Sequence, residues 1–177
     1  MRKTDLVVFE FSEDCLKVLR GKFLPDQTLQ VASLSSLKTE QPLVDSLSKS
    51  LSSMVTIKDK NSQIVVVIPR SQVILKNFLL PSHSREELQK MIGLQMATQV
   101  PYAREDIIFD YAVIGHSGTG HAKVLSAVVH RDVINEFLKI FRSAGLPIHQ
   151  FILSSSSIVK WFNGQYPQEA KSENATI

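Results

Sequence analysis

The sequence predicts a mixed fold, α/β or α+β, in which strands and helices follow one another along most of the chain. Residues 64–68 form an unbroken run of β-branched apolar side chains, which is typical of a strand buried on both faces. Residues 88–96 place apolar side chains at helical spacing, which indicates an amphipathic helix. Phe109, Tyr111 and Val113 would share one face of a further strand. At 177 residues the chain can form one or two small domains.

The composition argues against several classes of function. With 44% apolar and 21% charged residues, the chain has the make-up of an ordinary globular protein. The net charge of +3 is mild and the basic residues are scattered among acidic ones, so no nucleic-acid-binding patch is expected. No apolar run approaches the roughly 20 residues of a membrane span. The single cysteine, Cys15, excludes an internal disulfide and an all-cysteine metal site, and it fits a reducing compartment.

The first part of the chain is expected to contain strands over 5–11, 15–21, 28–34, 64–68 and 73–80, and a helix over 42–54. Pro69 and Pro81 would end the last two strands, because proline has no N–H to donate to a ladder. The helix is predicted from an apolar stripe that includes Leu47, Leu51 and Met54. Its other face is rich in serine, so a flexible linker is the alternative for this segment.

The second part is expected to contain helices over 85–99 and from Asp132 onward, and strands over 107–114, 121–130 and 148–153. Ser84 and Glu87 have the spacing of a capping box, in which the two side chains accept each other's backbone N–H groups. Pro101 would end the first helix, because the residue before a proline is pushed out of the helical region. Gly145 is suited to the left-handed residue just past the second helix.

These features occur in an order that resembles the PilM family of type IV pilus assembly proteins. The motifs in order are an apolar strand followed by Pro69-Arg70-Ser71, a strand ending Leu80-Pro81, a helix opening Glu86-Glu87-Leu88, then Val100-Pro101-Tyr102 and the strand from Asp110 to Gly115. The set is similar, more distantly, to the cytoplasmic part of the type II secretion protein GspL and to the division protein FtsA. The resemblance covers approximately residues 5–160 and implies an actin-like, ribonuclease H-like fold.

The resemblance also implies how the chain is divided. Residues 1–81 would form the first actin-like lobe, and residues 82–153 an inserted helix–strand–strand–helix–strand subdomain. Residues 154–177 would hold a return helix, a mobile polar stretch and, from Asn174 on, the truncated first strand of a second half. The chain is therefore expected to be the N-terminal half of a longer protein, and the alternative is a natural tail.

In actin-like ATPases the first hairpin carries a phosphate-binding turn, and Glu10, Ser12 and Lys17 occupy the corresponding positions here. Glu10 stands where an aspartate is expected, Lys17 keeps the basic residue, and Ser12 replaces a glycine. Glu13 and Asp14 add negative charges that would repel phosphate by about 1 kcal/mol each. We therefore expect no cofactor and no enzymatic activity from this chain. The alternative is an FtsA-like protein that binds ATP at a site completed by residues beyond 177.

Other chemical sites are not expected. His116 and His121 flank a glycine-containing segment, but no carboxylate or cysteine accompanies them and a strand follows, so a hairpin turn is favoured over a metal or phosphate site. The acidic residues near Cys15 disfavour its thiolate, which argues against a nucleophile. The sequence therefore predicts neither a metal site nor a catalytic residue.

The remaining candidate is a binding site for a protein partner. The PilM resemblance implies that a short peptide from the N-terminus of a membrane protein docks between the main and the inserted subdomains. The residues expected to line such a groove are Leu79, Leu80, Val100, Pro101, Tyr102, Phe109 and Tyr111. The alternative is that these residues only close the core.

The expected function is that of a cytoplasmic scaffold in a type IV pilus or type II secretion platform. The resemblance implies that it binds the cytoplasmic tail of an inner-membrane platform protein. It would then lie at the membrane only indirectly, through that partner. Whether the chain also forms a homodimer is left open by the sequence.

Overall fold

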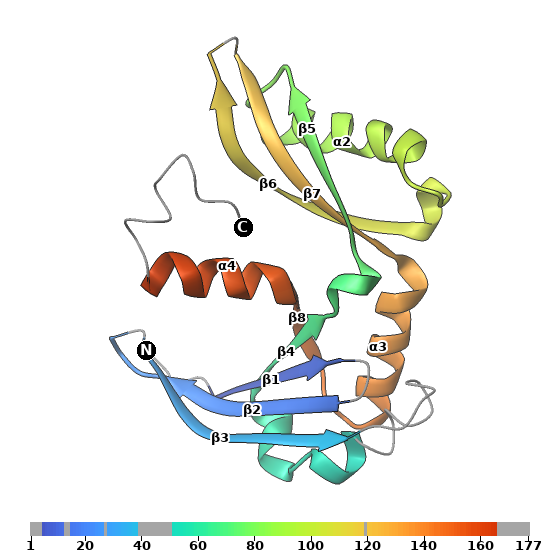
Figure 1. Cartoon of the computed structure of the whole chain (residues 1–177). Helices are drawn as coiled ribbons and strands as arrows, with labels where there is room; N and C mark the ends of the chain where they lie inside the picture. The colour runs from blue at the N-terminus through green and yellow to red at the C-terminus, as the bar shows by residue number, and fades with distance from the viewer. Residues whose placement is uncertain (1–4, 13–14, 27, 39–50, 119, 166–177) are drawn as a thin grey trace. The chain divides into compact units, whose positions relative to one another are not determined.

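The computed structural model describes residues 5–12, 15–26, 28–38, 51–118 and 120–165, leaving aside the side chains of 161–163 (Figure 1). The chain forms two compact units. Unit 1 comprises Met1–Arg70 and Leu138–Ile177, and unit 2 comprises Ser71–Phe137. Unit 2 is thus an insertion, because the chain leaves unit 1 and later returns to it.

Unit 1 is built on a five-stranded sheet, sheet A, with the strand order β3-β2-β1-β4-β8. Its strands are β1 (Asp5–Phe11), β2 (Cys15–Phe23), β3 (Leu29–Lys38), β4 (Gln63–Ile68) and β8 (Ile148–Leu153). The first three form an antiparallel meander, whereas β4 is parallel to both of its neighbours. All residues from Ile64 to Ile68 are buried, which confirms the prediction of a strand covered on both faces.

Aromatic packing organises the core of unit 1. Phe141, from the C-terminal half of α3 (Arg131–Ser143), packs edge-to-face against Phe9 and Phe11, with ring centroids 5.0 and 6.1 Å apart. Residues 51–54 are helical and Leu51 is fully buried, whereas the rest of the helix predicted over 42–54 lies outside the described residues. The helix α4 (Ser154–Gln165) follows β8, and the expected tail and strand start beyond it also fall outside the described part.

Unit 2 consists of a three-stranded antiparallel sheet, sheet B, with α2 (Arg85–Gln99) along one face (Figure 1). Its strands are β5 (Ile74–Leu80), β6 (Ile107–Ser117) and β7 (His121–His130), in the order β5-β7-β6. Leu88, Ile92 and Met96 of α2 belong to one buried cluster with residues of all three strands. The β6–β7 turn contains Gly120 at φ 77°, so the hairpin favoured over a metal or phosphate loop is confirmed.

Short 3-10 helices join these elements. They are η1 (Ile57–Asn61), η2 (Arg70–Gln72) and η3 (Arg104–Asp106). Gly145 has φ 72°, and its N–H donates to the carbonyl of Arg142, which confirms the predicted end of α3. Within the described residues, no helix is both long enough and apolar enough to cross a bilayer.

Two strands lie in different parts of the fold from those expected. Strand β5 was assigned to the first lobe, but it pairs with β7 in sheet B, where Phe78 and Leu80 face α2. Strand β8 was assigned to the insert, but it pairs with β4 in sheet A. The reason is that the chain turns into unit 2 at η2, directly after Pro69, and not at Pro81.

The predicted capping box at the start of α2 is also wrong in detail. The side chain of Ser84 makes no capping hydrogen bond. Instead, the Ser82 hydroxyl accepts the Ser84 N–H at 3.0 Å and donates to the Glu87 carboxylate. Ser82 is buried, and its side chain caps the start of α2 in place of Ser84, the residue predicted from the sequence spacing.

Candidate functional site

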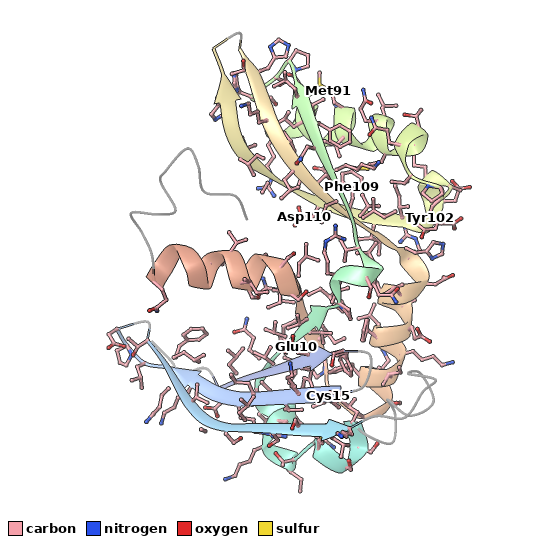
Figure 2. The ribbon with its side chains drawn as sticks, viewed as in Figure 1. Glu10, Cys15, Met91, Tyr102, Phe109 and Asp110 are labelled. Atoms are coloured by element: carbon pink, nitrogen blue, oxygen red, sulfur yellow. The ribbon has the colours of Figure 1, made fainter. Side chains whose placement is uncertain are left out.

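The β1–β2 hairpin brings the three candidate phosphate ligands together (Figure 2 labels Glu10 on β1 and Cys15 at the start of β2). The backbone N–H and the hydroxyl of Ser12 both donate to the carbonyl of Cys15, at 2.9 and 3.0 Å. Glu10 and Lys17 are cross-strand partners, and the Lys17 ammonium lies 3.4 Å from the Glu10 carboxylate. The donors of Ser12 are thus used inside the turn, and a carboxylate neutralises the candidate cation. Residues 13 and 14 lie outside the described part.

A partly buried ion pair lies elsewhere in unit 1, and sequence reasoning missed it. The Arg20 guanidinium donates to both carboxylate oxygens of Asp59, at 2.9 and 2.8 Å. It also donates to the carbonyl of Met54. The Asp59 carboxylate further accepts the N–H of Thr56 at 2.7 Å. These contacts tie β2 to η1 through a bidentate geometry that only arginine can offer.

The charge state of this pair follows from its surroundings. Burial raises the pKa of Asp59, but the hydrogen bonds from Arg20 and Thr56 and the charge of Arg20 outweigh it, so the pKa lies below its ordinary value. The hydrogen bond to Asp59 raises the pKa of Arg20 against the opposing effect of burial. Both groups are therefore charged at neutral pH. The signal in the sequence was Arg20 at the end of the inward-facing row Leu16, Val18, Arg20.

The ion pair forms part of the wall of a cavity of about 410 Å³ in unit 1. Leu6 and Val7 of β1 supply apolar wall, residues 30–32 of β3 also line the cavity, and Lys22 and Lys58 add positive charge. The cavity lies at the N-terminal end of β1, whereas the candidate phosphate ligands lie toward the other end of the β1–β2 hairpin.

The residues predicted to bind a partner fall into two groups in unit 2. Leu80 and Val100 are buried in its hydrophobic cluster, so the alternative of core closure applies to them. Phe109 and Tyr111 pack partly buried against the same cluster, and the Tyr111 hydroxyl donates to the carbonyl of Arg85 at 2.8 Å. Leu79 is 56% exposed. Of the seven residues, the accessible ones are therefore Leu79, Pro101 and Tyr102, with partial access to the two aromatic residues of β6.

The loop that carries Tyr102 contacts the end of β7 and the first residue of α3. The ring of Tyr102, which is labelled in Figure 2, packs edge-on against His130, with centroids 4.9 Å apart. Arg131 donates to the carbonyl of Glu105 at 2.7 Å and to that of Ile107 at 3.2 Å. These contacts hold the exposed loop between α2 and β6, and an ordered surface loses less entropy when a partner binds.

The face of sheet B opposite α2 carries exposed apolar side chains. The strand register places Leu79, Leu125 and Ala112 on this face, because their neighbours Phe78, Val124 and Tyr111 face α2. Ile108 is on the same face and is 37% exposed. Ile114, at the bulge in β6, is 58% exposed. Sequence reasoning missed Ile108 and Ile114, although their alternation with Phe109 and Val113 was a usable signal.

No described group of three or more histidine, cysteine, aspartate and glutamate side chains could hold a metal ion. His116 packs instead against His83, with ring centroids 4.8 Å apart. Two imidazoles without a further ligand make a poor metal site.

Comparisons with known proteins agree with this fold. The model of the type IV pilus assembly protein PilM family matches residues 17–171. A solved PilM–PilN type IV pilus biogenesis complex matches at a TM-score of 0.73 and 18% identity, covering 94% of this chain and 50% of that chain. No curated protein sequence matches the chain significantly.

Two further solved structures are similar. The cytoplasmic domain of EpsL, an inner-membrane component of the type II secretion system of Vibrio cholerae, matches at a TM-score of 0.58 and 16% identity, covering 85% of this chain and 57% of that chain. A Bacteroides thetaiotaomicron protein with an actin-like ATPase fold and unknown function matches at a TM-score of 0.50 and 13% identity, covering 92% of this chain and 56% of that chain. The chain thus spans about half the length of these structures and has their actin-like fold. Because the family model matches most of its length, the chain belongs to the PilM family of type IV pilus assembly proteins.

Proposed function

We propose that the chain is part of a non-enzymatic scaffold in a type IV pilus or type II secretion platform. It binds the cytoplasmic tail of an inner-membrane protein, and so lies on the cytoplasmic side of that membrane through its partner. Family membership supports this proposal, and so does the likeness to a PilM–PilN complex and to an inner-membrane secretion component. The observation that carries it is the pair of exposed apolar side chains along β6, Ile108 and Ile114.

The edge strand β6 gives this surface a way to hold a peptide. It is 11 residues long, and in the described part of the chain it pairs with β7 alone. An extended tail can add to such an edge through main-chain hydrogen bonds, while its alternate side chains contact apolar groups on the sheet. Ile108 and Ile114 lie along this edge, and the fixed loop with Pro101 and Tyr102 leads into it.

Binding of synthetic peptides tests the proposal. Peptides with the sequences of the cytoplasmic tails of inner-membrane pilus and secretion proteins are titrated into the labelled chain, and fluorescence anisotropy is recorded. One of them should bind, and Ile114→Asp should weaken that binding at least about tenfold, because a carboxylate would be desolvated at the contact. Leu94→Asp is the matched control, since Leu94 is 64% exposed on the outer side of α2. Absence of binding by every tail, or equal loss in both variants, would contradict the proposal.

A further inference from the structure

Strand β3 leaves an edge of sheet A exposed in unit 1. It is ten residues long, and among the described residues it pairs only with β2. Most of its residues are exposed, including Leu29, Val31 and Leu34 at 40, 51 and 69%. A long strand edge of this kind presents unpaired backbone N–H and C=O groups to another strand.

The irregular register of β3 collects its apolar side chains on one face. Val18 pairs with Ser35 on the buried face, so Leu34, opposite Leu19, points to the other face. The register then shifts between Arg20 and Gly21, which leaves Ala32 as the extra residue. Because of this shift, the side chains of Val31 and Leu29 lie on the same face as Leu34. Without the bulge they would point to the opposite face.

Close approach of the two backbones maintains this bulge. A Cβ atom on Gly21 would lie 2.7 Å from the carbonyl oxygen of Gln30, so only glycine fits. Phe23 pairs with Leu29 and is 41% exposed, so it extends the same apolar strip onto β2.

The strand lacks the features that prevent edge-to-edge pairing. Natural edges are protected by proline, by charged side chains or by being short. Residues 29–37 contain no proline and no charged residue, and the first charge is Lys38 at the end. An uncharged strand can pair with its own copy without bringing like charges together.

We propose that β3 pairs antiparallel with β3 of a second copy, joining the two sheets around a two-fold axis. The axis passes between Ala32 and Ser33, so that Val31 of each copy lies opposite Leu34 of the other. In this register, each residue on the apolar face of one copy lies opposite a residue on the same face of the other copy. This is possible because the extra residue at the bulge, next to the axis, reverses the alternation of side chains along the strand. The same edge is used by both copies, so two copies occupy it fully and the assembly ends at a dimer.

Sedimentation velocity of the 177-residue chain over a concentration series tests this proposal. The wild-type chain should form a dimer, and Leu34→Lys should weaken the dimer at least about tenfold, because two ammonium groups would be placed against apolar side chains at the contact. Leu94→Lys is the matched control, since both leucines are similarly exposed, at 64 and 69%. Unchanged circular dichroism shows that both variants fold.

A double variant tests the register itself. In Val31→Glu/Leu34→Lys each glutamate would lie opposite a lysine of the other copy, so dimerisation should recover, whereas Val31→Glu alone should weaken it. A monomeric wild-type chain, a dimer that withstands Leu34→Lys, or equal loss in the Leu94→Lys control would overturn the proposal. The double variant remaining monomeric would overturn the register. Leu34→Lys should still bind the tail peptide and Ile114→Asp should still dimerise, so this inference and the proposed function can fail separately.

Discussion

Arg20 and Asp59 form a bidentate ion pair in unit 1, and its partial burial sets how much it contributes to stability. The Asp59 side chain is only 3% exposed and that of Arg20 20% exposed, so a charge that loses its partner here stays largely desolvated. Breaking a buried pair on one side costs more than the pair itself contributes, because the remaining charge stays desolvated.

Asp59→Asn should therefore lower the free energy of unfolding by about 3 kcal/mol, measured by urea denaturation. The control is Glu10→Gln, which removes the exposed ion pair with Lys17 and should change stability by less than about 0.5 kcal/mol. Equal effects of the two substitutions would show that burial does not set the strength of the Arg20–Asp59 pair.

The same residue predicts a pH dependence. The pKa of Asp59 is lowered in the folded chain, so the pair contributes fully above the unfolded value of about 3.9 and loses its contribution as the pH falls through the lower folded value. The stability difference between the wild type and Asp59→Asn should thus be constant from neutral pH down to about pH 4 and shrink below it. Urea titrations at a series of pH values measure this difference, and one that stays constant to pH 2 would count against the assignment.

At the scale of elements, the start of α2 depends on a serine outside the helix. Ser82→Ala removes both the acceptor for the Ser84 N–H and the donor to Glu87, and it should cost about 1 kcal/mol in urea denaturation. Ser84→Ala removes no capping hydrogen bond and should cost clearly less. The opposite ranking would restore the capping box expected from sequence spacing.

Elements defined by local patterns could be predicted from the sequence, whereas their partners could not. The helix over 85–99 and the strand over 148–153 have the predicted bounds, because periodicity, Pro101 and Gly145 are local signals. The pairing of β8 with β4 depends on residues distant in the chain, which no local pattern encodes. Similarly, Arg20 looks like an ordinary strand residue until η1 places Asp59 beside it.

The candidate site could also be predicted only in part from local patterns. Seven residues were expected to line a partner groove, but alternation along a strand cannot say which face a helix will cover. The position of α2 buries Leu80 and leaves Leu79 exposed, so neighbours in the sequence have different roles. Ile108 and Ile114 became candidates only once the register of β6 was known.

At the scale of the whole molecule, we expect no tight nucleotide binding by this chain. The Lys17 ammonium lies next to Glu10, and the Ser12 donors are used within their turn. Isothermal titration with magnesium-ATP should therefore show no micromolar binding. Glu10→Gln frees the lysine and supplies the control, because any gain of affinity in this variant would show that the ion pair had blocked the site. Micromolar binding by the unmodified chain would favour the ATP-binding alternative.

The insertion of unit 2 between β4 and β8 has a consequence for synthesis on the ribosome. Sheet A needs β8 beside β4, yet Ile64 and its partner Ile148 are separated by all of unit 2. The continuous stretch Ser71–Phe137 can complete sheet B earlier, before β8 has been synthesised to complete sheet A. A nascent-chain force profile should show the inserted unit folding first and unit 1 only after residue 153 has left the exit tunnel. Unit 2, encoded in the middle of the sequence, would then fold before unit 1, whose strands come first.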